Sequence, residues 1–152
     1  MSSYYPGRDD QFRKGFSCPS RPVLIGSSDA IKRITEQAAR LAQTDKPVLI
    51  TGESGTGKEV VAKMIHCKSK RSTFPLVSIN CAAFPDELLD AELFGHEKGA
   101  FSSAIAQRVG LVESASGGSF FLDEIAELRL TLQPKLLRLL QDKELRRLGS
   151  NK

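Results

Sequence analysis

The chain has 152 residues, of which 40% are hydrophobic and 26% charged, and its formal net charge is +4. This length suits one ordinary globular domain. No apolar run approaches the ~20 residues that a helix needs to cross a bilayer, and the first ten residues lack the apolar core of a secretion signal. We therefore expect a cytoplasmic protein without a membrane segment.

The three cysteines, Cys18, Cys67 and Cys81, are odd in number and far apart. No C-x-x-C pair occurs, so the spacing indicates neither a disulfide framework nor a zinc site. We expect Cys67 and Cys81 to be small buried apolar residues. His96 does not begin a metalloprotease motif, because the residue four positions later is Ala100.

The N-terminal third of the chain predicts a tail, a helix and a strand. Residues 1–20 are polar, with Gly, Pro and Ser, and we expect a flexible tail. Ser27 or Ser28 then caps a helix. Its apolar residues recur at helical spacing: Ile31, Ile34, Ala38 and Leu41. Lys46 and Pro47 end this helix, and Val48–Thr51 is the first predicted strand.

The rest of the chain alternates between predicted strands and helices. A helix follows the first strand and runs to about Lys68. The second strand is Leu76–Ile79, ending at Asn80, and the third is Ser119–Leu122. Pro85 suits the first turn of the helix between them, Gly95–Gln107 reads as irregular, and a last helix is predicted over about 131–148. Apolar strands without alternation predict a parallel sheet buried on both faces, hence an α/β fold.

The most informative motif directly follows the first predicted strand. It consists of Gly52, Glu53, Ser54, Gly55, Thr56, Gly57, Lys58 and Glu59. The glycines let the backbone turn its N–H groups inward around a phosphate, and Lys58 adds a positive charge at the β- and γ-phosphates. The positive end of the next helix faces the same place. Strand, loop and helix in this order predict a P-loop. Glu59 stands where many P-loops carry a hydroxyl for Mg²⁺.

A second motif lies at the end of the third predicted strand, where Asp123 and Glu124 are adjacent. In a parallel α/β sheet, the carboxyl ends of the strands line the ligand crevice. Asp123 can hold Mg²⁺, directly or through water, and Glu124 can take a proton from an attacking water. Downstream of a P-loop, the pair predicts the hydrolytic half of an ATPase. It favours a hydrolase over a small P-loop kinase, the weaker alternative.

The basic residues form only a mild cluster near the C-terminal end: Arg138, Lys143, Arg146, Arg147 and Lys152. A solvated helix face explains it better than a nucleic-acid patch, because no aromatic residues are interleaved and no DNA-binding module is recognisable.

Four segments, in order, resemble the AAA+ domain of sigma-54-dependent transcriptional activators, the bacterial enhancer-binding proteins. They are Gly52–Glu59, Ser78–Ala83, Glu92–Phe101 and Ala115–Ile125. The similarity runs from about Val23 to the end, so residues 21–152 are expected to be the N-terminal part of that domain. The resemblance implies a three-layer P-loop NTPase fold with helices on both faces of a parallel sheet.

The resemblance also implies roles for individual residues. Val23–Gly26, including Ile25, would lie against the adenine of ATP. Asn80 would orient and restrain Glu124. A mobile loop would contact the sigma-54 factor and drive remodelling of the closed promoter complex, with Phe101 at its tip. The loop residues are Gly99, Ala100, Phe101, Ser102, Ser103 and Ala104. The family usually has Thr and Gly where this chain has Ser102 and Ser103.

The resemblance finally implies an assembly and an ending. The intact family hydrolyses ATP as a ring, with arginine fingers supplied by a neighbouring subunit. Its sheet order, numbered along the chain, is 5-1-4-3-2. This sequence stops at Lys152, before the family's last two core strands, helical lid and DNA-binding domain, so we expect a truncated and weakly active ATPase. The alternative is a catalytically inactive fragment that binds nucleotide, sigma factor or an intact relative.

Overall fold

The computed structural model describes Cys18 and residues 22–101, 104–142 and 147–149. The chain divides into two compact units. The first comprises Met1–Leu76 with Gly117–Ser119, and the second comprises Val77–Ser116 with Phe120–Lys152. No helix in the described ranges is both long enough and apolar enough to cross a membrane.

The described part of the first unit contains two helices. Helix α2 (Asp29–Leu41) begins where the sequence predicts, because the Ser28 hydroxyl accepts a hydrogen bond from the backbone N–H of Ile31 at 3.4 Å. Helix α3 (Lys58–Lys68) follows the glycine-rich loop. The two helices pack against each other, burying Ala38 of α2 and Met64 of α3. The first two predicted helices are thereby confirmed.

The prediction of a first strand is wrong. Val48–Thr51 has no hydrogen-bonded strand partner in the described part of the chain. Sequence periodicity predicts an extended apolar segment, but a β-ladder requires a neighbour.

Strands β1 (Leu76–Asn80) and β4 (Ser119–Asp123) form a two-stranded parallel sheet. They are the second and third predicted strands, and their pairing agrees with the predicted order. The sheet and its helices confirm the α/β P-loop NTPase class. Because the strands are parallel, the segments after Asn80 and Asp123 emerge at the same edge.

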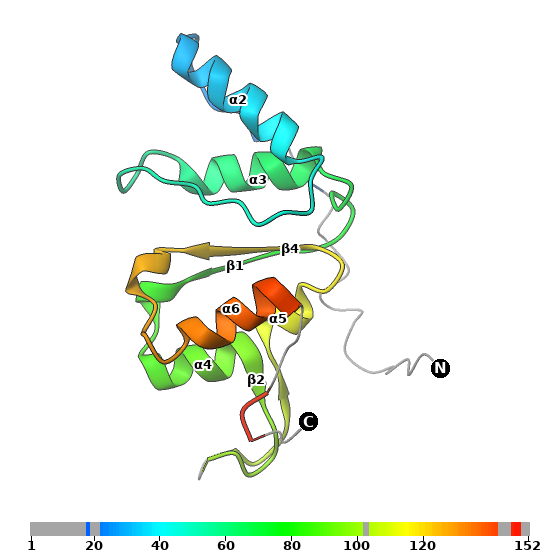
Figure 1. Cartoon of the computed structure of the whole chain (residues 1–152), viewed down its shortest axis with the longest axis vertical. Helices are drawn as coiled ribbons and strands as arrows, with labels where there is room; N and C mark the ends of the chain where they lie inside the picture. Colours follow the sequence, from blue (N-terminus) through cyan, green and yellow to red (C-terminus); the bar gives the residue numbers. More distant parts are fainter. Residues whose placement is uncertain (1–17, 19–21, 102–103, 143–146, 150–152) are drawn as a thin grey trace. The chain divides into compact units, whose positions relative to one another are not determined.

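The core of the second unit lies between this sheet and two helices, α4 (Asp86–Phe94) and α6 (Gln133–Asp142), which cover the same face (Figure 1). Its buried residues are Ile79, Cys81, Leu89, Leu93, Phe94, Leu128, Leu132 and Leu136. An ion pair also connects the two helices, because Lys135 Nζ of α6 donates to Asp90 Oδ2 of α4 at 2.7 Å. Leu132, just before α6, and Leu136 within it are buried as predicted, whereas Leu140, predicted on the same apolar stripe, is 49% exposed.

The segment predicted as irregular contains a short antiparallel ladder. Strand β2 (Gly95–His96) pairs with β3 (Arg108–Val109), with Gly95 opposite Val109 and His96 opposite Arg108. Helix α5 (Leu111–Ser114) follows directly. Strands of two residues carry no periodicity that a sequence pattern can reveal.

The last predicted helix does not extend to Leu148. The described part of α6 covers Gln133–Asp142, residues 143–146 lie outside the described residues, and Leu148 forms a parallel bridge with His96. The Leu148 backbone N–H donates to Gly95 O at 3.1 Å, and its carbonyl accepts from Glu97 N at 3.0 Å. The helix prediction is wrong at Leu148 because its backbone N–H and carbonyl groups form hydrogen bonds with Gly95 and Glu97 instead of bonds within a helix.

Gly110, directly after β3, permits a close backbone approach at this ladder. A Cβ added at Gly110 would lie 2.5 Å from both Gly95 N and Leu93 O, although its φ of −80° suits any residue. We expect Gly110→Ala to lower the free energy of unfolding by about 3 kcal/mol or more through steric overlap. Urea unfolding of the chain measures this.

Gly99→Ala is the matched control, because a Cβ there meets nothing within 4 Å and suffers only the strain of a φ of +82°. Its expected loss is about 1–2 kcal/mol. Equal losses for the two variants would contradict the close backbone approach.

Candidate functional site

The glycine-rich loop has the backbone geometry of a phosphate cradle. Gly55 and Gly57 have φ values of 78° and 90°, which only glycine adopts readily. Gly57 is the N-cap of α3, so the first free N–H groups of that helix open toward the loop. The Thr56 hydroxyl donates to Glu53 O at 2.8 Å and braces the turn.

Lys58 lies inside this turn. Its Nζ donates to Gly52 O at 3.1 Å and to Glu53 O at 3.2 Å. These carbonyls hold the ammonium group at the mouth of the loop. Glu59, the residue in place of the usual hydroxyl, forms an ion pair with Lys63 at 2.8 Å on the helix surface.

The segment expected against adenine lies beside the same loop. Leu24 Cδ2 is 3.8 Å from the position that a Cβ on Gly57 would occupy. Ile25 is 96% exposed, which leaves its side chain available to a ligand. Gly26 has a φ of +154° and turns the chain before α2.

A cavity of ≈ 370 Å³ lies within the first unit. Its polar end is lined by Gly52, Thr56 and Lys58 of the loop. Its apolar wall comes from both helices and from the extended segment: Ile34, Ala38, Leu41, Val48, Leu49, Ile50, Val61 and Ile65. Ile25 and Gly26 do not line it.

Asp123 and Glu124 lie at the carboxyl end of β4. Asp123 Oδ1 accepts a hydrogen bond from the Glu124 backbone N–H at 3.1 Å. Glu124 has φ 49° and is the only non-glycine residue of the described part with a positive φ. Such a conformation costs about 1–3 kcal/mol and marks functional positions in many proteins. The 3-10 helix η2 (Ile125–Glu127) begins directly after it.

Asn80 ends the neighbouring strand β1. Its side-chain Oδ1 accepts from Ala82 N at 2.8 Å and caps the 3-10 helix η1 (Cys81–Ala83). Burial, together with the negative charge of Asp123, raises the pKa of the Cys81 thiol. The fold therefore places Asn80, Asp123 and Glu124 at the carboxyl ends of the two paired strands. Among the described residues, no group of three His, Cys, Asp or Glu side chains could hold a metal alone.

The predicted partner loop begins after β2. Gly99 N donates to Ala104 O at 2.9 Å and closes the loop. Phe101 is 41% exposed, and its ring meets the His96 ring edge to face at 4.8 Å. Ala104 is buried, and Ser102 and Ser103 lie outside the described residues.

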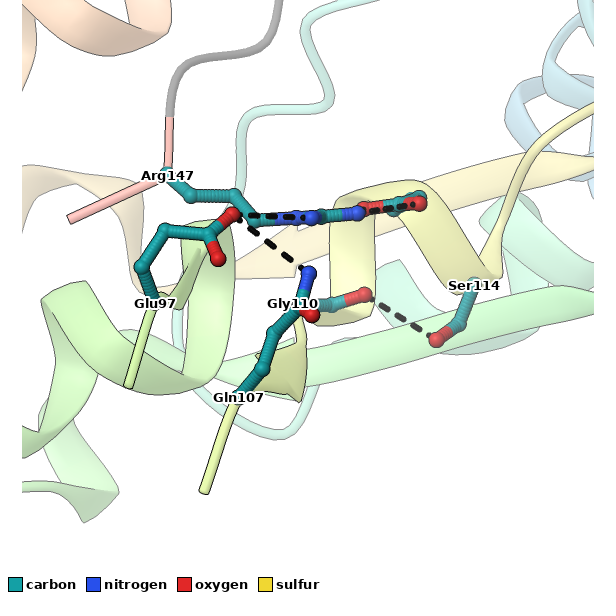
Figure 2. Close-up of polar contacts among 6 residues, drawn as sticks. Glu97, Gln107, Gly110, Ser114 and Arg147 are labelled. Carbon is teal, nitrogen blue, oxygen red and sulfur yellow. Dashed lines mark hydrogen bonds and ion pairs between the residues drawn. The ribbon is translucent and has the colours of Figure 1, made fainter. Parts of the chain in front are cut away.

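Arg147 joins the base of this loop to α5. Its guanidinium donates to Glu97 Oε1 at 3.0 Å (Figure 2). It also donates to both carboxylate oxygens of Glu113, at 2.8 and 2.9 Å. Gln107, on the returning side of the loop, donates to the same Glu97 oxygen at 3.4 Å. The two carboxylates raise the pKa of Arg147. The prediction that Arg147 belongs to a solvated helix face is therefore wrong.

We expect Arg147→Met to lower the free energy of unfolding by about 1–2 kcal/mol, because it leaves two neighbouring carboxylates without their shared cation. A double-mutant cycle with Glu113→Gln in urea measures the coupling, expected near 1 kcal/mol. Arg40→Met is the control. Its pair with Glu36 is 4.0 Å long and largely exposed, so its expected effect is below about 0.5 kcal/mol. Zero coupling would contradict the bidentate contact.

One prediction about cysteine is wrong. Cys18 and Cys67 form a disulfide, with Cα atoms 5.9 Å apart, whereas Cys81 is buried and free as predicted. The odd number of cysteines and the separation of 49 residues gave no indication of this disulfide in the sequence. Only the fold brings the last turn of α3 to Cys18.

These features together define a P-loop NTPase: a glycine-rich loop capping a helix, and acidic residues at a strand end. A family model for the sigma-54 interaction domain matches residues 24–152. The chain belongs to the sigma-54 interaction domain family, as the resemblance predicts.

Curated relatives are transcription regulators. The chain is 51% identical over 134 residues to the transcriptional regulatory protein FlgR of Helicobacter pylori, covering 88% of this chain and 35% of FlgR. It is 55% identical over 131 residues to the response regulator protein FleR of Pseudomonas aeruginosa, covering 86% of this chain and 27% of FleR. The chain thus spans about a third or less of these relatives.

Solved structures of NtrX from Brucella abortus are similar to this chain in fold and sequence. NtrX from Brucella abortus in complex with ATP has a TM-score of 0.77 at 38% identity, covering 86% of this chain and 27% of NtrX. NtrX in complex with ADP gives the same TM-score and identity.

Proposed function

We propose that this chain binds ATP and supplies the nucleotide site of a sigma-54-dependent transcription regulator. The observation that carries the proposal is the P-loop itself, in which Gly57 caps α3 and Lys58 lies across the loop. The ATP and ADP complexes of NtrX support the choice of nucleotide. Transcription regulation also makes a cytoplasmic location the natural expectation.

Each part of the site has a separate task. The N–H groups of Gly52–Lys58 and the Lys58 ammonium bind the phosphates. Ile25 and Gly26 flank the adenine. Asp123 fits a magnesium ion, because Mg²⁺ takes one or two carboxylates together with nucleotide phosphates and water. When bound, that ion neutralises charge on the phosphates.

Glu124 acts as general base toward the attacking water, and Asn80 orients its carboxylate from the neighbouring strand end. Self-association into a ring would supply residues from a second subunit. The competing function is a catalytically inactive module that binds nucleotide without turnover.

ATP hydrolysis separates the two functions. Residues 24–152 of this chain are exchanged into H. pylori FlgR in place of the matching segment, and phosphate release is measured with and without Mg²⁺. Active turnover supports the ATPase, and ATP binding without turnover supports the inactive module. Absence of binding contradicts both.

We further propose that the loop 99–104 contacts the sigma-54 factor and couples hydrolysis to remodelling of the closed complex. Phe101 supports this role, because it is an apolar side chain that stays 41% exposed in a loop of small residues.

We expect Phe101→Ala to abolish sigma-54 binding while changing nucleotide affinity less than about twofold. The lost ring contact with His96 removes only about 0.5–1.5 kcal/mol of stability. The measurement is retention of the FlgR chimera on immobilised sigma-54 with a non-hydrolysable ATP analogue. Ile105→Ala is the control, since Ile105 is 84% exposed just outside the loop. A larger loss of stability would identify Phe101 as a core residue.

A further inference from the structure

The disulfide between Cys18 and Cys67 is the feature that the proposed site leaves unexplained. Cys67 lies in the last turn of α3, and both residues are partly exposed. Their Cα separation of 5.9 Å falls within the range of ordinary disulfides. A dissolved thiol or disulfide can therefore reach them.

A permanent disulfide does not suit the proposed cytoplasmic role. Reducing compartments keep thiols reduced, and disulfides found there are usually catalytic or redox-sensing. A cysteine pair already at bonding distance needs no rearrangement to open and close. The physical question is what changes when it does.

The bond lies at the C-terminal end of α3, and the glycine-rich loop lies at the N-terminal end of the same helix. Gly57 and Lys58 stand at the beginning of this helix, and Cys67 stands at its end. From Gly57 to Cys67 the helix rises about 15 Å. Leu24, six residues after Cys18, lies close to Gly57, with its Cδ2 atom 3.8 Å from the position that a Cβ on Gly57 would occupy. Six residues reach at most about 20 Å, so the closed bond tethers Leu24 to the C-terminal end of α3 within that reach.

The adenine-flanking residues follow immediately. Ile25 and Gly26 lie between the Leu24 contact and the N-cap of α2 at Ser28. With the bond closed, this segment is anchored on both sides. With the bond open, the described residues on its N-terminal side hold it through noncovalent contacts alone, such as the position of Leu24 near Gly57.

We propose that Cys18 and Cys67 are a reversible redox switch that sets how firmly residues 22–26 are held beside the P-loop, and thereby the affinity for nucleotide. This inference rests on the proposed nucleotide binding. A preorganised segment loses less conformational entropy when ligand binds, so the oxidised chain binds more tightly.

The oxidant is a low-molecular-weight disulfide such as oxidised glutathione. One cysteine thiolate attacks it, forming a mixed disulfide and releasing one glutathione thiolate. The second cysteine thiolate attacks the protein sulfur of that mixed disulfide and releases the other. Two protein thiols lose two protons and two electrons, and the oxidant becomes two thiols. Excess thiol reverses the sequence.

The test uses the 152-residue chain equilibrated in mixtures of reduced and oxidised glutathione. Alkylation and peptide mass spectrometry measure the Cys18–Cys67 peptide, and a fluorescent ATP analogue measures affinity in the same samples. We expect the dissociation constant to be about tenfold lower in the oxidised chain, which corresponds to the entropy of ordering about one residue. Affinity should follow the bonded fraction.

Three variants test whether the change in affinity depends on this disulfide. Cys18→Ser and Cys67→Ser should each keep the reduced-state affinity in every mixture. Cys81→Ala should behave like the unmodified chain, because Cys81 is buried in the other unit. Absence of the linked peptide in oxidised glutathione overturns the inference, as does equal affinity with the bond open and closed. Loss of analogue binding in both states, with the bond formed, instead refutes the proposed nucleotide binding and the switch with it.

Discussion

Lys58→Ala should abolish detectable ATP binding. The Lys58 ammonium lies 3.1 Å from Gly52 O and 3.2 Å from Glu53 O, so it is already positioned at the mouth of the loop. Bound phosphates offer it charged oxygens, and each charge-assisted hydrogen bond contributes about 1.5–3 kcal/mol. Two such contacts correspond to an affinity loss of at least about 10²-fold.

Titration calorimetry of the chain with ATP measures this effect. Lys63→Ala is the matched control, because Lys63 lies on the same helix and pairs with Glu59 at 2.8 Å on its surface. That variant should bind ATP within about twofold of the unmodified chain. Circular dichroism verifies that α3 remains folded in both. Unchanged affinity in Lys58→Ala would show that the loop does not bind phosphates through this residue.

Glu124→Gln should stop ATP hydrolysis while sparing ATP binding. Glutamine keeps the shape of the side chain and tolerates the φ of 49° as well as glutamate does. Its amide cannot take a proton from water, so turnover should fall by about 10²–10⁴-fold. The dissociation constant for ATP should change by less than about threefold, since the phosphate contacts come from the P-loop.

The FlgR chimera provides the turnover measurement. Glu127→Gln is the control, because Glu127 is an exposed carboxylate three residues later in η2, and it should retain full turnover. Wild-type turnover in Glu124→Gln would refute the general-base assignment. Equal losses in both variants would point to a change in η2 rather than to proton transfer.

Local sequence patterns correctly predicted the features that depend only on residues within one short segment. Ser28 caps α2, and glycines at positions 55 and 57 adopt the positive φ values that the loop needs. Strands β1 and β4 are short apolar runs ending in Asn80 and Asp123. Each of these signals depends on residues close together in sequence, so a pattern can reveal it.

Sequence patterns did not reveal the features that depend on residues far apart along the chain. The apolar run 48–51 lacks the ladder that would make it a strand, and Leu148 leaves the predicted helix to bridge His96. Arg147 looked like one of several exposed cations, yet it joins Glu97 and Glu113. Their pairing requires the loop, α5 and the chain after α6 to meet.

The sequence by itself determined the family, the phosphate-binding loop and the adjacent carboxylates, because glycine freedom, helix capping and a charged strand end are local properties. Only the tertiary structure decided that Cys18 meets Cys67 across 49 residues and that Glu97, Glu113 and Arg147 share one cluster. Bond formation and ion pairing depend on separation in space. That separation is set by how helices and strands pack, and not by the spacing of residues along the chain.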